Sequence, residues 1–212
     1  MGPTVTDPGT RVPLAVRRLL VVVALVATAT LGWRETHAVF SDTTTNTGNS
    51  ITVVNCTAQI LGNPGFETGT PAPWAATYAD EITNSGPPPR TGSFNAVLDL
   101  DNNTDKRKSL TQTVSIPSFC ATATFSFWLR IQTSPAPGVS NMHIRVLNST
   151  GATVLATLQT FPHTTTATYQ QYTYNLTAYR GQTIMVRFEA IGTGTRRTIY
   201  IIDDTSLTLT AS

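Results

Sequence analysis

The feature of this chain best suited to chemistry is an aromatic ring beside basic side chains. These residues alternate with apolar ones along extended segments. Trp128 and Arg130 alternate with apolar residues, and His143, Arg145 and Arg187 do the same further along. Residues two apart in a strand share a face, so these side chains point away from the apolar residues between them. Aromatic faces stack on sugar rings and polar side chains meet hydroxyls. We therefore predict one ligand-binding platform made of these five residues.

A covering loop is the alternative for Trp128, and solvation or ion pairing is the alternative for the arginines. Catalytic chemistry has less support. The sequence holds no Gly-x-Ser-x-Gly elbow, no His-Glu-x-x-His pair and no phosphate loop. A glycosidase needs two carboxyl groups beside one cleft, and although Glu67 and Glu189 could be arranged so, both have simpler roles. We expect no enzymatic activity and no catalytic residues.

Two cysteines, Cys56 and Cys120, lie 64 positions apart. An even number of cysteines in an exported chain predicts one disulfide, with free buried thiols as the alternative. Two thiols without nearby histidines make an incomplete zinc sphere.

The strand that must position Trp128 is the clearest element in the sequence. Over residues 121–131, Phe125, Phe127, Leu129 and Ile131 share one face, which a second sheet must cover. Similar short alternating segments recur at intervals of about 8–12 residues, which is typical of a sandwich or barrel. The expected strands span residues 51–61, 75–82, 94–100, 110–116, 121–131, 142–147, 153–159, 169–176, 183–190 and 198–209. We predict an all-β antiparallel β-sandwich with jelly-roll connections.

Three parts follow one another along the 212 residues. Residues 1–38 have a basic start and an apolar run at 19–31, as a signal peptide does; an uncleaved anchor is the alternative. The run is shorter than the roughly 20 residues of a membrane span, so no stable span is expected after cleavage. A polar linker at 39–52 and a domain at 53–212 follow, and the predicted location is extracellular or at the cell surface.

Charge argues against nucleic acid as a partner. The formal net charge is only +2, and the basic cluster at 106–108 is flanked by aspartates, so we expect a solvated loop there.

Five motifs in order, over about residues 58–210, resemble those of jelly-roll carbohydrate-binding modules of the family four, nine and twenty-two type. They are NPGFE at 63–67 followed by Trp74, TGSFNA at 91–96, FSFWL at 125–129, LTAYRGQTIMVRF at 176–188 and YIIDDTSL at 200–207. The resemblance implies a galactose-binding-like fold, a polysaccharide or glycan partner and a packing role for Trp74. It does not identify a ligand, since the same sandwich serves as an adhesive domain.

The same resemblance implies a structural calcium ion. Its side-chain ligands would be Glu67 and either Asp203 or Asp204, with carbonyl oxygens near 92–95 completing the shell. The alternative is that these carboxylates pair with arginine or with backbone N–H groups. The function expected is a secreted or cell-surface carbohydrate-binding-like module without catalysis. The alternative function is a structural or adhesive envelope protein that uses the sandwich without binding sugar.

Overall fold

The computed structural model describes residues 56–78, 81–101 and 107–211. The chain divides into two units, Met1–Ile51 and Thr52–Ser212, and the described residues all belong to the second. The predicted signal peptide and linker therefore lie outside the described residues. In the described part of the chain, no helix is long and apolar enough to cross a membrane.

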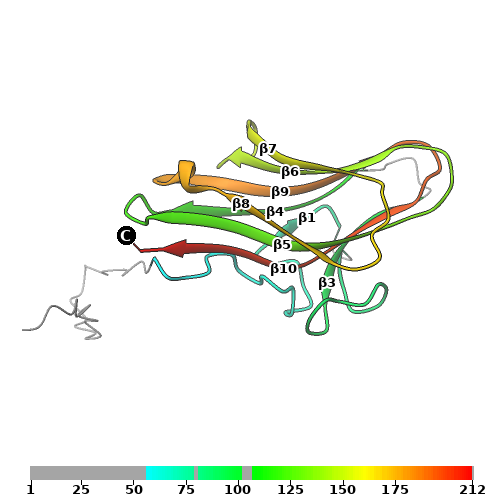
Figure 1. Ribbon diagram of the computed structural model, residues 1–212, viewed down its shortest axis with the longest axis horizontal. Helices are drawn as coiled ribbons and strands as arrows, with labels where there is room; N and C mark the ends of the chain where they lie inside the picture. Colours follow the sequence, from blue (N-terminus) through cyan, green and yellow to red (C-terminus); the bar gives the residue numbers. More distant parts are fainter. Residues whose placement is uncertain (1–55, 79–80, 102–106, 212) are drawn as a thin grey trace, which may run out of the picture. The chain divides into compact units, whose positions relative to one another are not determined.

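Two five-stranded antiparallel sheets face each other (Figure 1). Sheet A has the order β2-β3-β10-β5-β8, with bounds Ile82–Thr83, Asn95–Leu100, Thr198–Thr210, Thr122–Thr133 and Gln170–Asn175. Sheet B has the order β1-β4-β9-β6-β7, with bounds Ala75–Ala76, Arg107–Ile116, Gln182–Gly192, Ser140–Asn148 and Val154–Pro162. Most neighbouring strands are distant in sequence, as with β5 and β10 in Figure 1. The expected antiparallel jelly-roll sandwich is confirmed.

Aromatic rings from both sheets fill the space between them. Phe125 and Phe127 of β5 are fully buried, and the Phe127 ring meets Phe188 of β9 edge-on at a centroid distance of 4.9 Å. Trp74 is also buried, 6.0 Å from Phe188, and its indole N–H donates to the carbonyl of Asn63. The predicted inward face of β5 and the packing role of Trp74 are confirmed.

A disulfide joins Cys56 to Cys120, with 5.4 Å between the Cα atoms. The predicted pairing is confirmed. It ties the first described residue to the connection between β4 and β5.

Two predicted strands differ from the structure. Of the strand expected at 51–61, residues 51–55 lie outside the described residues, and the rest makes a single bridge between Gln59 and Thr208. Two backbone hydrogen bonds join this segment to β10, from Ile60 to Leu207 and from Leu209 to Ala58. The Gln59 side chain adds to them, because its carbonyl oxygen accepts from the backbone N–H of Leu207 at 2.7 Å and its amide donates to Thr205. The strand expected at 75–82 is two short strands, β1 and β2, because the chain passes there from sheet B to sheet A.

Candidate functional site

The five residues predicted to form one platform lie on two different sheets. Trp128 and Arg130 belong to β5 of sheet A, whereas His143, Arg145 and Arg187 belong to β6 and β9 of sheet B. The apolar residues between them pack against the opposite sheet, so the two sets point outward from opposite layers. The prediction of a single platform is wrong, because alternation tells inside from outside and does not tell which sheet a strand joins.

On sheet A, the loop before β3 covers Trp128. The guanidinium carbon of Arg90 lies 3.6 Å from the centre of the indole ring, a cation–π contact. Arg90 also forms an ion pair with Asp204 at 2.5 Å, and its backbone N–H donates to Asp203 at 2.7 Å. The Arg90 side chain therefore occupies one face of the indole. The half-buried Trp128 is covered by a loop, which was the alternative to contact with a ligand.

The two aspartates of β10 have different surroundings. Asp203 is fully buried, and its carboxylate accepts backbone N–H bonds from Arg90, Thr91 and Asp204. Burial raises the pKa of Asp203 to about 6, although these hydrogen bonds oppose the rise. Asp204 is more exposed and binds only side chains, the guanidinium of Arg90 and the hydroxyl of Thr91 at 2.6 Å. A register shift in β10 between Asp203 and Ser206 accompanies this difference.

Glu67, the third predicted calcium ligand, holds the turn before β3. Its carboxylate accepts the backbone N–H groups of Ser93 at 2.9 Å and Phe94 at 3.1 Å. Both side chains pass near Gly65, where an added Cβ would lie 3.7 Å from Oδ1 of Asp204 and 3.7 Å from Cγ of Glu67. Among the described residues, no three His, Cys, Asp or Glu side chains converge as a metal cluster, so carbonyl oxygens would have to supply most of a calcium shell.

On sheet B, a buried carboxylate organises the outer face. Glu189 is only 1% exposed, and it accepts from Arg107 of β4, with the Arg107 Nε 3.0 Å away, and from a terminal nitrogen of Arg145 of β6. Strand pairing sets this arrangement, since His143 lies opposite Glu189 and Arg145 lies opposite Arg187. We call the outer surface carrying Arg107, Arg145 and Arg187 the arginine face.

Two guanidinium groups of the arginine face have donors to spare. The Nε atoms of Arg145 and Arg187 are buried without a hydrogen-bond partner. A terminal nitrogen of Arg187 lies 3.8 Å from the sulfur of Met185. The turn between β6 and β7 comes close on this side, since a Cβ at Gly151 would lie 3.3 Å from that terminal nitrogen. The arrangement offers cationic hydrogen-bond donors on an outer sheet surface beside a turn.

The electrostatics of the arginine face follow from these contacts. Burial by itself raises the pKa of Glu189, but the hydrogen bond from Arg107 and the surrounding positive charges outweigh it and hold the pKa below its ordinary value. Burial and the charge of Arg145 lower the pKa of His143, whose Nδ1 lies 3.0 Å from the hydroxyl of Thr160. At neutral pH the face therefore carries an ionised Glu189 and an uncharged His143.

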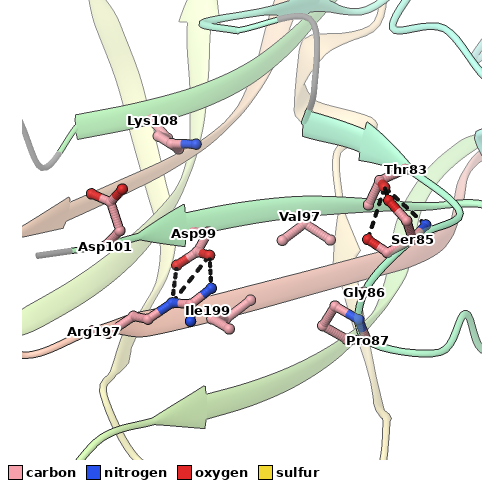
Figure 2. A pocket seen from close by; sticks show the side chains of 10 residues that line it. All are labelled: Thr83, Ser85, Gly86, Pro87, Val97, Asp99, Asp101, Lys108, Arg197 and Ile199. Atoms are coloured by element: carbon pink, nitrogen blue, oxygen red, sulfur yellow. Dashed lines mark hydrogen bonds and ion pairs between the residues drawn. The ribbon is translucent and has the colours of Figure 1, made fainter. Parts of the chain in front are cut away.

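A separate cavity of about 330 Å³ opens on the outer side of sheet A, away from the arginine face (Figure 2). Val97 and Ile199 give it an apolar wall, and Thr83 and Ser85 lie at one end. Its cationic Arg197 already binds Asp99 through two nitrogens, with the Nε 3.0 Å from one oxygen. Because this charged pair is matched within the chain, the cavity shows less unmet bonding capacity than the arginine face.

Three important residues were not predicted to belong to a binding site. Arg107 was expected in a solvated loop, but it begins β4 and binds Glu189. Glu189 was noted only as a remote catalytic possibility. Its alternation with Arg187 was the available signal. Arg90 lies in a Pro- and Gly-rich segment without periodicity, so no sequence pattern could have placed it over Trp128.

Comparisons with known proteins agree on the fold. No protein-family model matches the sequence, and the comparison with curated proteins finds no match. Among solved structures, the carbohydrate-binding module TmCBM61 in complex with β-1,4-galactotriose is similar with a TM-score of 0.53 and 18% identity, covering 72% of this chain and 99% of that one. The K3 cleaved adhesin domain of Lys-gingipain from Porphyromonas gingivalis W83 has a TM-score of 0.51 and 19% identity, over 71% and 99% of the two chains. At these identities the likeness establishes the jelly-roll fold, which is shared by carbohydrate-binding modules and by an adhesin domain.

Proposed function

We propose that this chain is a secreted or cell-surface, non-catalytic module that binds glycans through the arginine face of sheet B. The observation that carries the proposal is the pair Arg145 and Arg187, opposite each other on adjacent strands, with buried Nε–H donors that lack a partner. A buried donor without an acceptor is costly, and a ligand oxygen supplies the missing acceptor. TmCBM61, of similar fold, was solved with a bound galactotriose.

The surroundings of this pair suit a hydroxylated ligand. Thr111 and Thr157 flank the two arginines in the same row across the sheet, one on each side. Hydroxyl and guanidinium groups together provide the donors and acceptors that sugar hydroxyls need. Trp128 and Arg130 do not contribute to this row, since they lie on sheet A.

Catalysis is not part of the proposal. Glu189 is the carboxylate at the centre of the arginine face, and two arginines hold it in its ionised form with a lowered pKa. A general acid needs a raised pKa instead. Secretion is supported by the disulfide, which persists in oxidising compartments.

An adhesive or envelope role without sugar binding is the second candidate, and the likeness to the gingipain adhesin domain favours it. A glycan array followed by calorimetry separates the two. We expect saccharide binding that falls about tenfold or more in Arg187→Ala, because a charge-assisted hydrogen bond is lost. Arg197→Ala, on sheet A, is the matched control and should bind normally. If the folded protein binds no saccharide on the array, the adhesive role is favoured.

We also propose a structural calcium ion held by Glu67 and Asp204. Backbone N–H groups already occupy the oxygens of Asp203 and also those of Glu67, whereas Asp204 binds side chains. The ion would therefore have to share Glu67 with the N–H groups of Ser93 and Phe94. When bound, the ion would neutralise these carboxylates and tie the opening loop to β10. Adding EDTA should lower the melting temperature of the native protein and leave Glu67→Gln unaffected. An unchanged melting temperature, with no metal in the purified protein, would remove the site.

A further inference from the structure

Sheet B has an excess of positive charge. Its outer face carries three arginines, Arg107, Arg145 and Arg187, and a single carboxylate, Glu189, whereas Lys108 of β4 lines the cavity with Asp99 and Asp101. That carboxylate is bound by Arg107 and Arg145. The one anion of the sheet is therefore already shared by two cations, and its hydrogen bonds go to Arg107 and Arg145 rather than to Arg187.

Arg187 is the arginine of this face that forms no ion pair with Glu189. It lies directly opposite Arg145, and like charges opposite each other on adjacent strands destabilise a sheet. Its interactions within the chain are a long contact with the Met185 sulfur and the field of Glu189. An anion from outside would relieve the repulsion. After a shift of the two side chains, its oxygens would accept hydrogen bonds from the buried Nε–H groups of both arginines.

The guanidinium group also selects the kind of anion. Its planar fork matches the two oxygens of a carboxylate or the oxygens of a sulfate ester, so that two parallel hydrogen bonds form. The flanking Thr111 and Thr157 suit neutral hydroxyl groups beside that anion. A short cluster bordered by threonines differs from the extended basic stripe that a nucleic-acid backbone requires.

We propose that the ligand of the arginine face is an anionic saccharide, with the carboxylate of a uronic acid or a sulfate ester bound between Arg187 and Arg145. This inference rests on the proposed function and narrows its ligand class. Glu189 acts as a positioning residue, since it anchors Arg145 from below and leaves Arg187 for the ligand. The negative field of Glu189 also disfavours an anion directly above it, which directs the ligand toward Arg187.

The test is calorimetry of the purified full chain with four defined probes. These are oligogalacturonate, its methyl ester, a sulfated heparin oligosaccharide and neutral galactotriose. We expect one of the two anionic probes to bind at least about tenfold more tightly than galactotriose, as the loss of a charge-assisted pair implies. Methyl esterification should abolish the preference if the carboxylate is the recognised group. A preference for the sulfated heparin oligosaccharide would instead identify the sulfate ester as the anionic group that is recognised.

Two variants of Arg187 locate the site. Arg187→Met removes the charge but keeps the length, and it should lose the preference for the anionic probe. Its melting temperature without ligand should stay equal or rise, because the repulsion with Arg145 is gone. Arg187→Lys keeps the charge without the fork, so its affinity should fall between those of the wild type and Arg187→Met. Arg197→Met on sheet A is the control and should bind like the wild type.

Each contrary result has a distinct meaning. Equal affinity for galactotriose and both anionic probes, unchanged in Arg187→Met, would overturn this inference and leave glycan binding intact. Equal affinity for single-stranded DNA would also overturn it, since the face would then be a general polyanion site. No binding of any saccharide would overturn both this inference and the proposed function.

Discussion

On the two outer sheet faces, the role of each charged residue depends on the side chains that it contacts. Arg90 is held over Trp128 by Asp204, whereas Arg187 faces another arginine. The first side chain is used within the fold and the second has bonding capacity left. Arg130 on sheet A also has a buried Nε–H without a partner, so this contrast holds for Arg90 and Arg187 and not for every arginine.

Trp128 provides a direct test of this distinction at the residue scale. Trp128→Ala should lower the free energy of unfolding by about 2 kcal/mol, because a half-buried ring and its cation–π contact with Arg90 are both lost. Binding at the arginine face should not change. Urea unfolding and calorimetry measure the two effects, and Trp128→Phe, which keeps an aromatic face, should lose less. Lost saccharide binding with unchanged stability would return Trp128 to the ligand site.

Glu189 makes the stability of the protein depend on pH. Its pKa is lower in the folded chain than its ordinary value of about 4.3, so the unfolded chain binds more protons near that pH. The stabilisation is complete above the ordinary pKa and is lost as the pH falls through the lowered one. His143, whose pKa is also lowered, adds to the loss at higher pH, as it protonates.

Urea unfolding between pH 6 and pH 3 checks this expectation. Below about pH 5, where His143 is protonated in the unfolded chain, the wild type should lose stability more steeply than Glu189→Gln, which has no carboxyl group to titrate. Parallel slopes in the two proteins would contradict the role of Glu189.

At the scale of elements, the loop between β2 and β3 is held by carboxylates from elsewhere in the chain. Asp203 and Asp204 of β10 bind it near residue 90, and Glu67 binds it at 93–94. Gly92, between these two anchors, has a φ of +63° and leaves room for the Glu67 carboxylate. The conformation of this loop is therefore determined by contacts that are remote in sequence.

Gly92→Ala should disturb this loop. An added Cβ would lie 2.3 Å from a Glu67 oxygen, so the carboxylate must move and release its two backbone N–H donors. We expect a loss of about 2 kcal/mol, from strain at positive φ and from the lost hydrogen bonds. Gly181→Ala, where φ is +76° and an added Cβ would meet only the Cβ of Ser118 at 3.4 Å, is the matched control for backbone strain alone. Equal losses in thermal unfolding of the two variants would refute the contribution of Glu67.

At the scale of the whole domain, segments distant in sequence are joined in pairs. β3 and β5 flank β10 in sheet A, and β4 and β6 flank β9 in sheet B. The disulfide adds a covalent link between positions 64 residues apart. Folding of the domain therefore requires the closure of long loops, and each closure lowers the conformational entropy of the chain.

Removal of the disulfide should therefore be costly. A double substitution, Cys56→Ala with Cys120→Ala, should lower the free energy of unfolding by about 4 kcal/mol in the chain-entropy model for a loop of this length. Both cysteines are buried in the core, but the fold should remain, because the aromatic contacts that join the two sheets involve other residues. Urea unfolding of the variant, beside wild type with and without dithiothreitol, gives the measurement. An unchanged unfolding midpoint in both reduced wild type and variant would contradict the expectation.

The sequence by itself determined most strands of the domain and which of their faces is buried, with the segments at 51–61 and 75–82 as the exceptions. Period-2 alternation placed Phe125 and Phe127 inside and Trp128 outside, and the cysteine count, together with the expectation of export, predicted the disulfide. These properties depend on local geometry or on composition, so they can be recognised without a structure. The jelly-roll fold also followed, from the number and spacing of the strands and from the five motifs.

Only the tertiary structure decided which outward side chains meet. Strand order assigned β5 to one sheet and β6 and β9 to the other, which separated Trp128 from Arg145 and Arg187. Loop contacts placed Arg90 over Trp128, and strand register placed Glu189 between Arg107 and Arg145. Partnership across a sheet is set by hydrogen bonding between segments far apart in the chain, and the alternation within one strand carries no information about its neighbours.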